Sequence, residues 1–262
     1  MRKNFADILK TAKIDLFQEY IRLYTLFYRS KDDHGETLKI ECESSFLNIP
    51  FRGTCLSLDD FNQTHNFFFE PEPQHFDPDY LIKFCEYTYN LIVHLEDRHS
   101  SPFAIFYLQQ MMKVLDLMDY KWLRVKDMNV NILVPQKQEA LAVAEIVKEE
   151  IAYSVLEYNH HSLKGNLPKK KATLKLMADD IEPQRKILNG INKTLADNLF
   201  QMFQKFVRHN NEDNWFIKNL SKEALEMCYD DIYQMWLLAK LEIDNLERKK
   251  RIEFILQKIN TK

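Results

Sequence analysis

Apolar residues recur at spacings of three and four along most of the chain, which is the pattern of amphipathic helices that bury one face. Such segments cover residues 4–30, 79–98, 102–119, 137–161, 168–189, 192–208 and 221–259. Pro183 and Gly190 interrupt this pattern, and proline removes a backbone donor from a helix. We therefore expect the helical run between residues 168 and 208 to break at both positions.

Two stretches depart from the helical pattern in the first half of the chain. Leu38, Ile40 and Cys42 alternate with charged residues, the period of a short strand, and a second short extended run follows Arg52-Gly53. Residues 122–134 predict a β-hairpin with a polar turn at 126–129. The fold class is therefore expected to be mainly α, a helical bundle with a small β element and a β-hairpin in the N-terminal half.

The pattern also divides the chain into two regions. Residues 1–135 mix helix and strand, carry the Phe67-Phe68-Phe69 run in a proline-rich loop, and are interpreted as a sensing or regulatory region. We expect the three phenylalanines to anchor their loop on the core. Residues 136–262 are nearly all helical and predict a bundle.

Composition excludes several classes of site. The four glycines form no GxxxxGK or GxGxxG pattern, so a glycine-rich phosphate loop is not expected. The four cysteines form no CxxC pair, and no histidine cluster has metal-ligand spacing, so neither a metal site nor a cofactor is predicted. No run approaches the roughly 20 apolar residues that span a bilayer, and no signal-peptide block begins the chain. We therefore expect a cytoplasmic protein with no membrane association.

Charge is segregated along the chain. Residues 32–97 hold 14 acidic and three basic residues, a net charge of −11. Residues 164–193 hold eight basic and three acidic residues, a net charge of +5. Such segregation steers an anionic partner to one face, or lets two parts or two subunits attract each other.

The strongest candidate for chemistry is Arg208-His209, at the end of the predicted helix 192–208. Arginine binds phosphate in a bidentate manner and histidine transfers protons near neutral pH. These two side chains suit metal-free cleavage of RNA by the 2′-hydroxyl. Supporting hydrogen bonds are expected from Asn210, Asn211, Asp213 and Tyr229. The alternative is a polar helix end whose arginine pairs with nearby carboxylates.

The segment from Lys175 to Leu188, the run Phe206-Val207-Arg208-His209-Asn210-Asn211 and the final helix carry a family resemblance. Over residues 137–262 the chain resembles the HEPN domains of bacterial toxins and abortive-infection proteins. The resemblance implies a helical bundle that dimerises through its C-terminal helices. It also implies a metal-independent ribonuclease in antiviral defence.

One departure from the family pattern leaves two functions open. In the family, histidine follows arginine after four to six residues, whereas His209 is adjacent to Arg208. Either His209 has taken over the acid-base role, or the chain is a non-catalytic interaction or adaptor subunit of a defence complex. A partner protein of that complex would then bind it.

A basic stretch precedes the candidate site. Six side chains could bind RNA phosphates electrostatically: Lys169, Lys170, Lys171, Lys175, Arg185 and Lys186. The alternative is a solvated helix face. On the final helix, Glu226, Asp230 and Asp231 are expected to favour the helix N-terminus or to pair with the Arg208 region.

Overall fold

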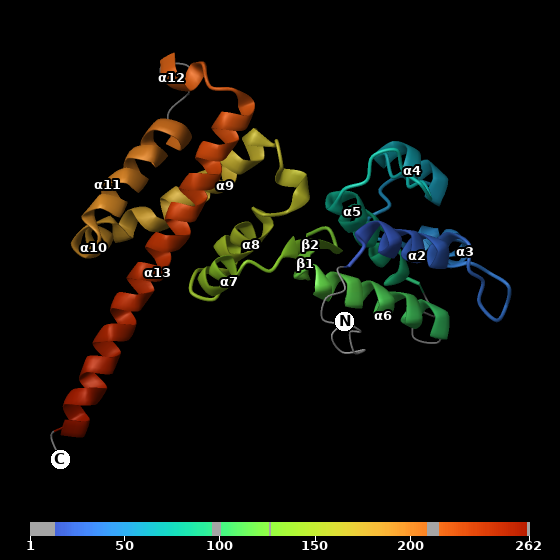
Figure 1. Cartoon of the computed structure of the whole chain (residues 1–262), viewed down its shortest axis with the longest axis horizontal. Helices are drawn as coiled ribbons and strands as arrows, with labels where there is room; N and C mark the ends of the chain where they lie inside the picture. Colours follow the sequence, from blue (N-terminus) through green and yellow to red (C-terminus); the bar gives the residue numbers. More distant parts are fainter. Residues whose placement is uncertain (1–13, 96–100, 126, 209–214, 261–262) are drawn as a thin grey trace, which may run out of the picture. The chain divides into compact units, whose positions relative to one another are not determined.

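The computed structural model describes residues 14–95, 101–125, 127–208 and 215–260, with the backbone alone for Trp215 and Phe216. The chain forms two compact units, residues 1–135 and 136–262 (Figure 1). The described residues are mainly helical, and their strands form a single antiparallel hairpin. The expected fold class is confirmed.

The N-terminal unit contains five described α-helices, one 3₁₀ turn and the hairpin. In chain order these are α2 (Leu16–Tyr28), α3 (Leu38–Ser44), η1 (Phe46–Asn48), α4 (Leu58–His65), α5 (Pro78–Ile92), α6 (Pro102–Leu117), β1 (Tyr120–Val125) and β2 (Val130–Pro135). Ser101 accepts a hydrogen bond from the Ala104 amide, and Pro102 occupies the first turn of α6, a position that proline suits.

The predicted strand over residues 38–42 is wrong, because these residues form helix α3. Leu38 and Cys42 are buried and lie one turn apart, while Ile40 is exposed. The Thr37 hydroxyl accepts a hydrogen bond from the Ile40 amide and begins the helix. Leu38 and Cys42 are four residues apart, which fits one helical turn as well as two repeats of a strand. Over only five residues, the pattern therefore could not distinguish a helix from a strand. The extended run expected after Arg52-Gly53 is also absent from the described strands.

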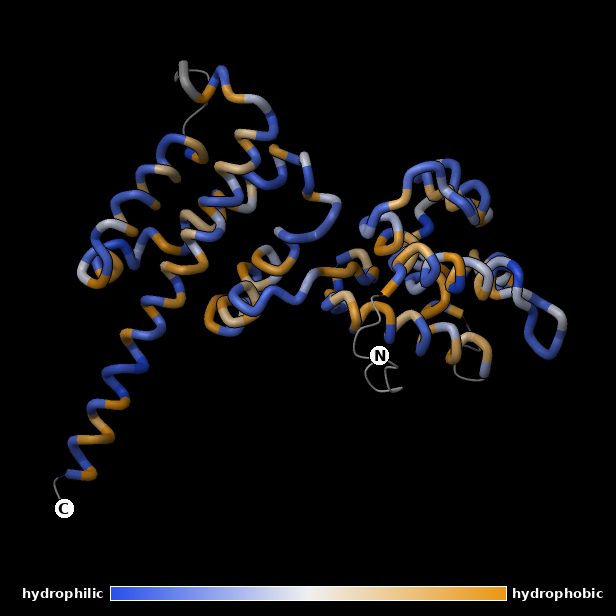
Figure 2. Tube along the Cα trace, viewed as in Figure 1, coloured by the Kyte–Doolittle hydropathy of each residue, from blue (hydrophilic) through white to orange (hydrophobic). Residues whose placement is uncertain are grey.

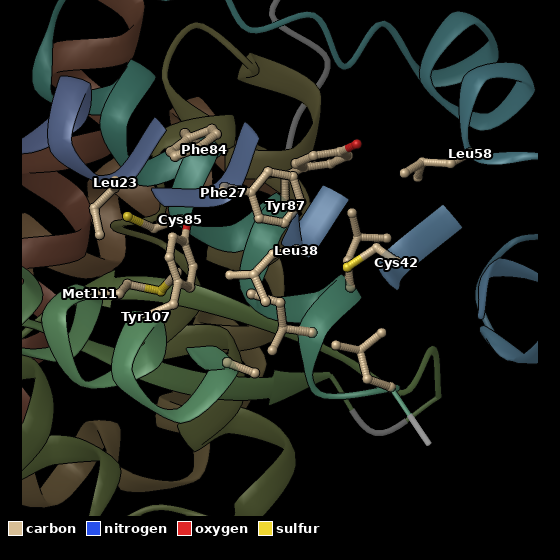
Figure 3. Packing of buried hydrophobic residues seen from close by; sticks show 14 of the residues in the cluster. Leu23, Phe27, Leu38, Cys42, Leu58, Phe84, Cys85, Tyr87, Tyr107 and Met111 are labelled. Atoms are coloured by element: carbon tan, nitrogen blue, oxygen red, sulfur yellow. The ribbon is translucent and has the colours of Figure 1, made fainter. Parts of the chain in front are cut away.

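Aromatic rings fill the core of the N-terminal unit. The ring centroids of Phe84 and Tyr87 on α5 and of Tyr107 on α6 lie within 6.4 Å of the Phe27 centroid on α2, and Figure 3 shows these side chains in the same core as Leu38. The Tyr107 hydroxyl donates to Thr88 Oγ1 at 2.9 Å, which satisfies a buried polar group. This unit therefore has its own core.

The proline-rich loop is anchored on that core as expected. Phe67 and Phe69 pack against it, whereas Phe68 is exposed. Two of the three adjacent phenylalanine rings therefore hold the loop on the core.

The hairpin is fixed on α5 by side chains of that helix, including Glu86, whose Oε1 accepts a hydrogen bond from the Leu133 amide at 2.6 Å. Asn90 Nδ2 donates to the Asn131 carbonyl and Asn90 Oδ1 accepts from the Asn131 amide, both at 2.7 Å. The Trp122 ring stacks on Tyr89 with 3.9 Å between centroids. The register pairs Trp122 with Leu133, and the predicted hairpin is confirmed.

The C-terminal unit is entirely helical in its described part. Its elements are α7 (Gln138–Ala144), α8 (Glu149–Glu157), η2 (His161–Leu163), α9 (Leu167–Ile181), η3 (Glu182–Gln184), α10 (Arg185–Ile191), α11 (Lys193–Met202), the π-helical η4 (Phe203–Arg208), α12 (Trp215–Lys218) and α13 (Lys222–Asn260). The predicted interruption at Pro183 is confirmed. The one expected near Gly190 falls at Asn192, which caps α11.

The prediction of a single helix over residues 137–161 is wrong, because α7 and α8 are separate helices. The β-branched residues Ile146 and Val147 lie between the two helices and favour helix weakly. Glu149 and Glu150 occupy the first turn of α8, where carboxylates interact favourably with the helix dipole. The apolar spacing continues across the break and so conceals it.

Helix α13 organises this unit by packing against α7, α9, α10 and α11. Its first half buries Tyr229, Tyr233 and Trp236, whereas every residue from 247 to 260 is exposed. Figures 1 and 2 show this end of the helix reaching beyond the other helices of the unit, with apolar positions along it. Among the described helices, none combines the length and the apolar composition needed to cross a membrane.

Candidate functional site

Arg208 ends the π-helical segment η4, which packs against α9. Phe203, Phe206 and Val207 are buried and fix this segment on the core. Gln204, Lys205 and Arg208 remain on its surface. Short π-helical turns occur frequently at functional sites, since they re-aim side chains relative to the preceding α-helix.

The Arg208 guanidinium is held by groups at the end of α9 and the start of η3. Nη1 lies 2.7 Å from Glu182 Oε2, and Nη2 lies 3.3 Å from Asp179 Oδ1. Nη2 also donates to the Ala178 carbonyl at 3.4 Å. The pairing of Arg208 with nearby carboxylates, stated above as the alternative to a catalytic role, is therefore present in the structure.

A surface cavity of about 420 Å³ lies beside Arg208. It is lined by cationic, carboxamide, acidic and aromatic side chains: Arg185, Lys205, Arg208, Gln201, Gln204, Glu182, Asp197 and Phe200. The Arg185 guanidinium carbon lies 4.6 Å from the Phe200 ring centroid, a cation–π contact that leaves the side chain 55% exposed. The three cations outnumber the two carboxylates, although Glu182 also lies 3.5 Å from Arg185 Nη1, so the lining carries a net charge of +1 and two carboxamide donors that suit an anion.

The other residues of the predicted site have different positions. His209, Asn210, Asn211 and Asp213 lie outside the described residues. Tyr229 is 2% exposed and belongs to the core of the C-terminal unit.

The six basic residues predicted to bind RNA do not share one environment. Lys175, Arg185 and Lys186 are exposed, and Lys171 is half-buried. Lys169 Nζ lies 2.6 Å from Glu157 Oε1. Arg185 is the member of this set that lines the cavity beside Arg208.

Lys170 is buried, with its side chain only 6% exposed. Its Nζ lies 2.7 Å from Glu226 Oε1 and 2.7 Å from Asp230 Oδ1. Glu226 and Asp230 therefore pair with Lys170, and the expected pairing with the Arg208 region is not among the described contacts. Lys170 links α9 to α13, and RNA phosphate would have to displace two carboxylates to reach it.

Sequence reasoning missed this buried polar cluster. Tyr158 donates to Asp230 Oδ1 at 3.0 Å, and the Gly165 amide donates to Glu226 Oε1 at 2.8 Å. The hydrogen bond from Lys170 holds the pKa of Glu226 below its usual value, with the Gly165 amide adding to the effect. The spacing of Glu226 and Asp230, four residues apart on one helical face, was the available signal.

No protein-family model, curated protein or solved structure matches this chain.

Proposed function

We propose that the C-terminal unit acts on RNA, as a metal-independent ribonuclease of the HEPN type in a bacterial anti-phage defence or toxin system. The observation that carries the proposal is the cavity beside Arg208, where Arg185 and Lys205 supply two further cations. Arg208 would bind the scissile phosphate, since a guanidinium presents paired N–H donors that match phosphate oxygens.

The carboxylates around Arg208 are compatible with this role. The described contacts use three of its five N–H donors. The side chains of Asp179 and Glu182 are 63% and 37% exposed, and ion pairs of such exposure contribute about 0–1 kcal/mol. They hold the guanidinium at the cavity and compete only weakly with a phosphate.

His209 would supply proton transfer, because it directly follows Arg208 in the chain and imidazole titrates near neutral pH. Exposed Lys175 and Lys186 would add attraction to the RNA backbone.

A cleavage assay tests the proposal. Total RNA and purified tRNA are incubated in EDTA with the wild type, Arg208→Ala, His209→Ala and the control Arg248→Ala. Arg248 is an exposed arginine that is also ion-paired, to Asp244 on α13. We expect cleavage by the wild type and the control. The cleavage rate should fall at least tenfold in Arg208→Ala and in His209→Ala, since one lost charge-assisted contact costs about 1.5–3 kcal/mol.

Equal cleavage by the wild type, Arg208→Ala and His209→Ala would contradict the assigned site. Absence of wild-type cleavage would contradict the ribonuclease and favour a second candidate.

That second candidate is a non-catalytic interaction or adaptor subunit of a defence complex, acting as a homodimer or with a partner protein. The end of α13 favours it. Ile252, Ile255, Leu256 and Ile259 are each at least 50% exposed and recur at spacings of three and four, so they form one apolar stripe. Such a stripe is typical of helices that pair with another helix.

Light scattering after size exclusion tests the dimer. We expect a dimeric wild type, and monomers for Ile255→Glu and Leu256→Glu. Lys250→Glu introduces the same side chain on the opposite side of the helix and should remain dimeric. A monomeric wild type, or stripe variants that remain dimers, would contradict dimerisation through α13.

A further inference from the structure

A second cavity, of about 200 Å³, lies in the C-terminal unit where α8 ends and α13 begins. The stacked rings of Tyr158 and Tyr233 line it, with 4.1 Å between their centroids and an interplanar angle of 6°. Both tyrosines are at most 3% exposed. This cavity shares no lining residue with the one beside Arg208.

The cavity is rich in hydrogen-bond donors. The ammonium groups of Lys137, Lys164 and Lys170 line it, whereas Asp230 supplies the single carboxylate among the lining residues. Lys170 is the buried member, fixed by Asp230 and by Glu226 behind it. Lys137 donates to Asn159 Oδ1 at 2.8 Å, and this bond holds the ammonium group next to the Asn159 carboxamide. Three lysines against Asp230 and the Glu226 carboxylate that pairs with Lys170 leave a net charge of +1, and this excess of positive charge favours an anion.

The hydroxyl groups of both tyrosines are already engaged within the protein, because Tyr158 donates to Asp230 Oδ1 at 3.0 Å and Tyr233 donates to the Val155 carbonyl at 2.9 Å. Burial and the neighbouring Asp230 carboxylate raise the pKa of Tyr158. Burial raises the pKa of Tyr233, although Asn159 Nδ2 donates to its hydroxyl at 2.9 Å. Both phenols therefore remain protonated near neutral pH, and neither serves as a base or a nucleophile.

The volume of the cavity limits the size of the ligand that it can hold. Sites for drug-sized molecules measure roughly 300–1,000 Å³, so a cavity of about 200 Å³ suits one small group. We propose that this cavity binds a phosphate group, either as free phosphate or as a small phosphate monoester, through the ammonium groups of Lys137 and Lys164 above Lys170. The proposal is independent of any activity at Arg208.

Isothermal titration calorimetry of the full chain tests the proposal. Inorganic phosphate and glycerol 3-phosphate are titrated separately, with sodium chloride at matched ionic strength as the reference. We expect saturable binding of phosphate, and at least a tenfold weaker Kd for Lys137→Gln and for Lys164→Gln. Lys222→Gln removes an exposed lysine of α13 that does not line the cavity, and it should bind as the wild type does.

The two ligands separate the possible sources of the phosphate. Binding of inorganic phosphate alone supports the free ion as the ligand, and binding of both supports a monoester site. Since Lys137 and Lys164 are exposed, both variants should fold, and an unchanged circular dichroism spectrum verifies this. Heats equal to those of sodium chloride, or equal affinity in all four proteins, would overturn the proposal.

Discussion

At the residue scale, two cations of the C-terminal unit occupy different environments. Arg208 is 30% exposed at the edge of a cavity, whereas Lys170 is 6% exposed between two carboxylates. A buried charge whose partner is removed is costly, while an exposed ion pair contributes little. Lys170 therefore stabilises the junction of α9 with α13, and Arg208 remains available to a ligand.

We predict that Lys170→Met destabilises the protein by about 2 kcal/mol near pH 7, because Glu226 loses its main partner. This value lies below the roughly 3–5 kcal/mol of fully buried pairs, since Asp230 is 48% exposed. Urea unfolding measures the difference, with Lys175→Met as the control. A destabilisation no greater than that of the control would contradict the structural role of Lys170.

The loss of stability caused by Lys170→Met should depend on pH. The folded-state pKa of Glu226 is lowered, so its contribution to stability is fully present above about pH 4.3 and is lost as the pH falls through the folded value. We expect the difference in unfolding free energy between wild type and Lys170→Met to shrink when urea unfolding is repeated at about pH 3. An unchanged difference would show that Glu226 does not titrate against Lys170.

At the element scale, helix ends are set by single polar side chains. Asn192 Oδ1 accepts a hydrogen bond from the Leu195 amide at 3.1 Å and begins α11, while Asn192 Nδ2 donates to Glu242 Oε1 at 3.1 Å. One residue thus caps α11 and joins it to α13. The orientation of η4 depends on α11, because η4 continues directly from that helix.

We predict that Asn192→Ala lowers the unfolding free energy by about 1–2 kcal/mol, because an N-cap and an interhelical hydrogen bond are both lost. Asn198→Ala replaces an exposed asparagine within α11 and should change stability by less than about 0.5 kcal/mol. Thermal unfolding compares the two variants. Equal stability would contradict the capping role of Asn192.

The helices were largely predictable from the sequence, for a physical reason. Burial of one helix face repeats apolar residues over ten or more positions, as in the first half of α13, and a proline such as Pro183 adds a local stop. The strand expected at Leu38–Cys42 failed because five residues contain too little of either period. The break between α7 and α8 was missed because apolar spacing continues across it.

The candidate site was less predictable, because its contacts join residues distant in sequence. Arg208 was identified from its place at a helix end, but its carboxylate partners lie 26 and 29 residues earlier. The two partners of Lys170, Glu226 and Asp230, lie on another helix, 56 and 60 residues away. Residue types suggested an RNA-binding role for Lys170, whereas burial gives it a structural one.

At the scale of the whole molecule, the chain has two separate hydrophobic cores. The N-terminal core includes Leu133, and the C-terminal core begins with Ala140. The two units contain 135 and 127 residues, and both lengths are within the usual size range of an independent domain. The cavity beside Arg208 and the cavity lined by Tyr158 and Tyr233 both belong to the C-terminal unit.

We predict that residues 136–262 fold alone. The fragment should give a helical circular dichroism spectrum and one cooperative unfolding transition, because its core is complete without the N-terminal unit. A fragment that unfolds without cooperativity would show that the C-terminal core needs residues 1–135.

The measurement that most directly tests the account is the affinity of the full chain for a labelled single-stranded RNA in EDTA, followed by fluorescence anisotropy over a range of salt concentrations. Arg208→Ala should bind about tenfold more weakly than wild type, with a salt slope smaller by about 1, because one phosphate contact is lost. Arg248→Ala, which removes an equal charge outside the cavity, should bind more tightly than Arg208→Ala. Equal affinities and equal salt slopes for wild type and Arg208→Ala would contradict a phosphate-binding role for the cavity beside Arg208.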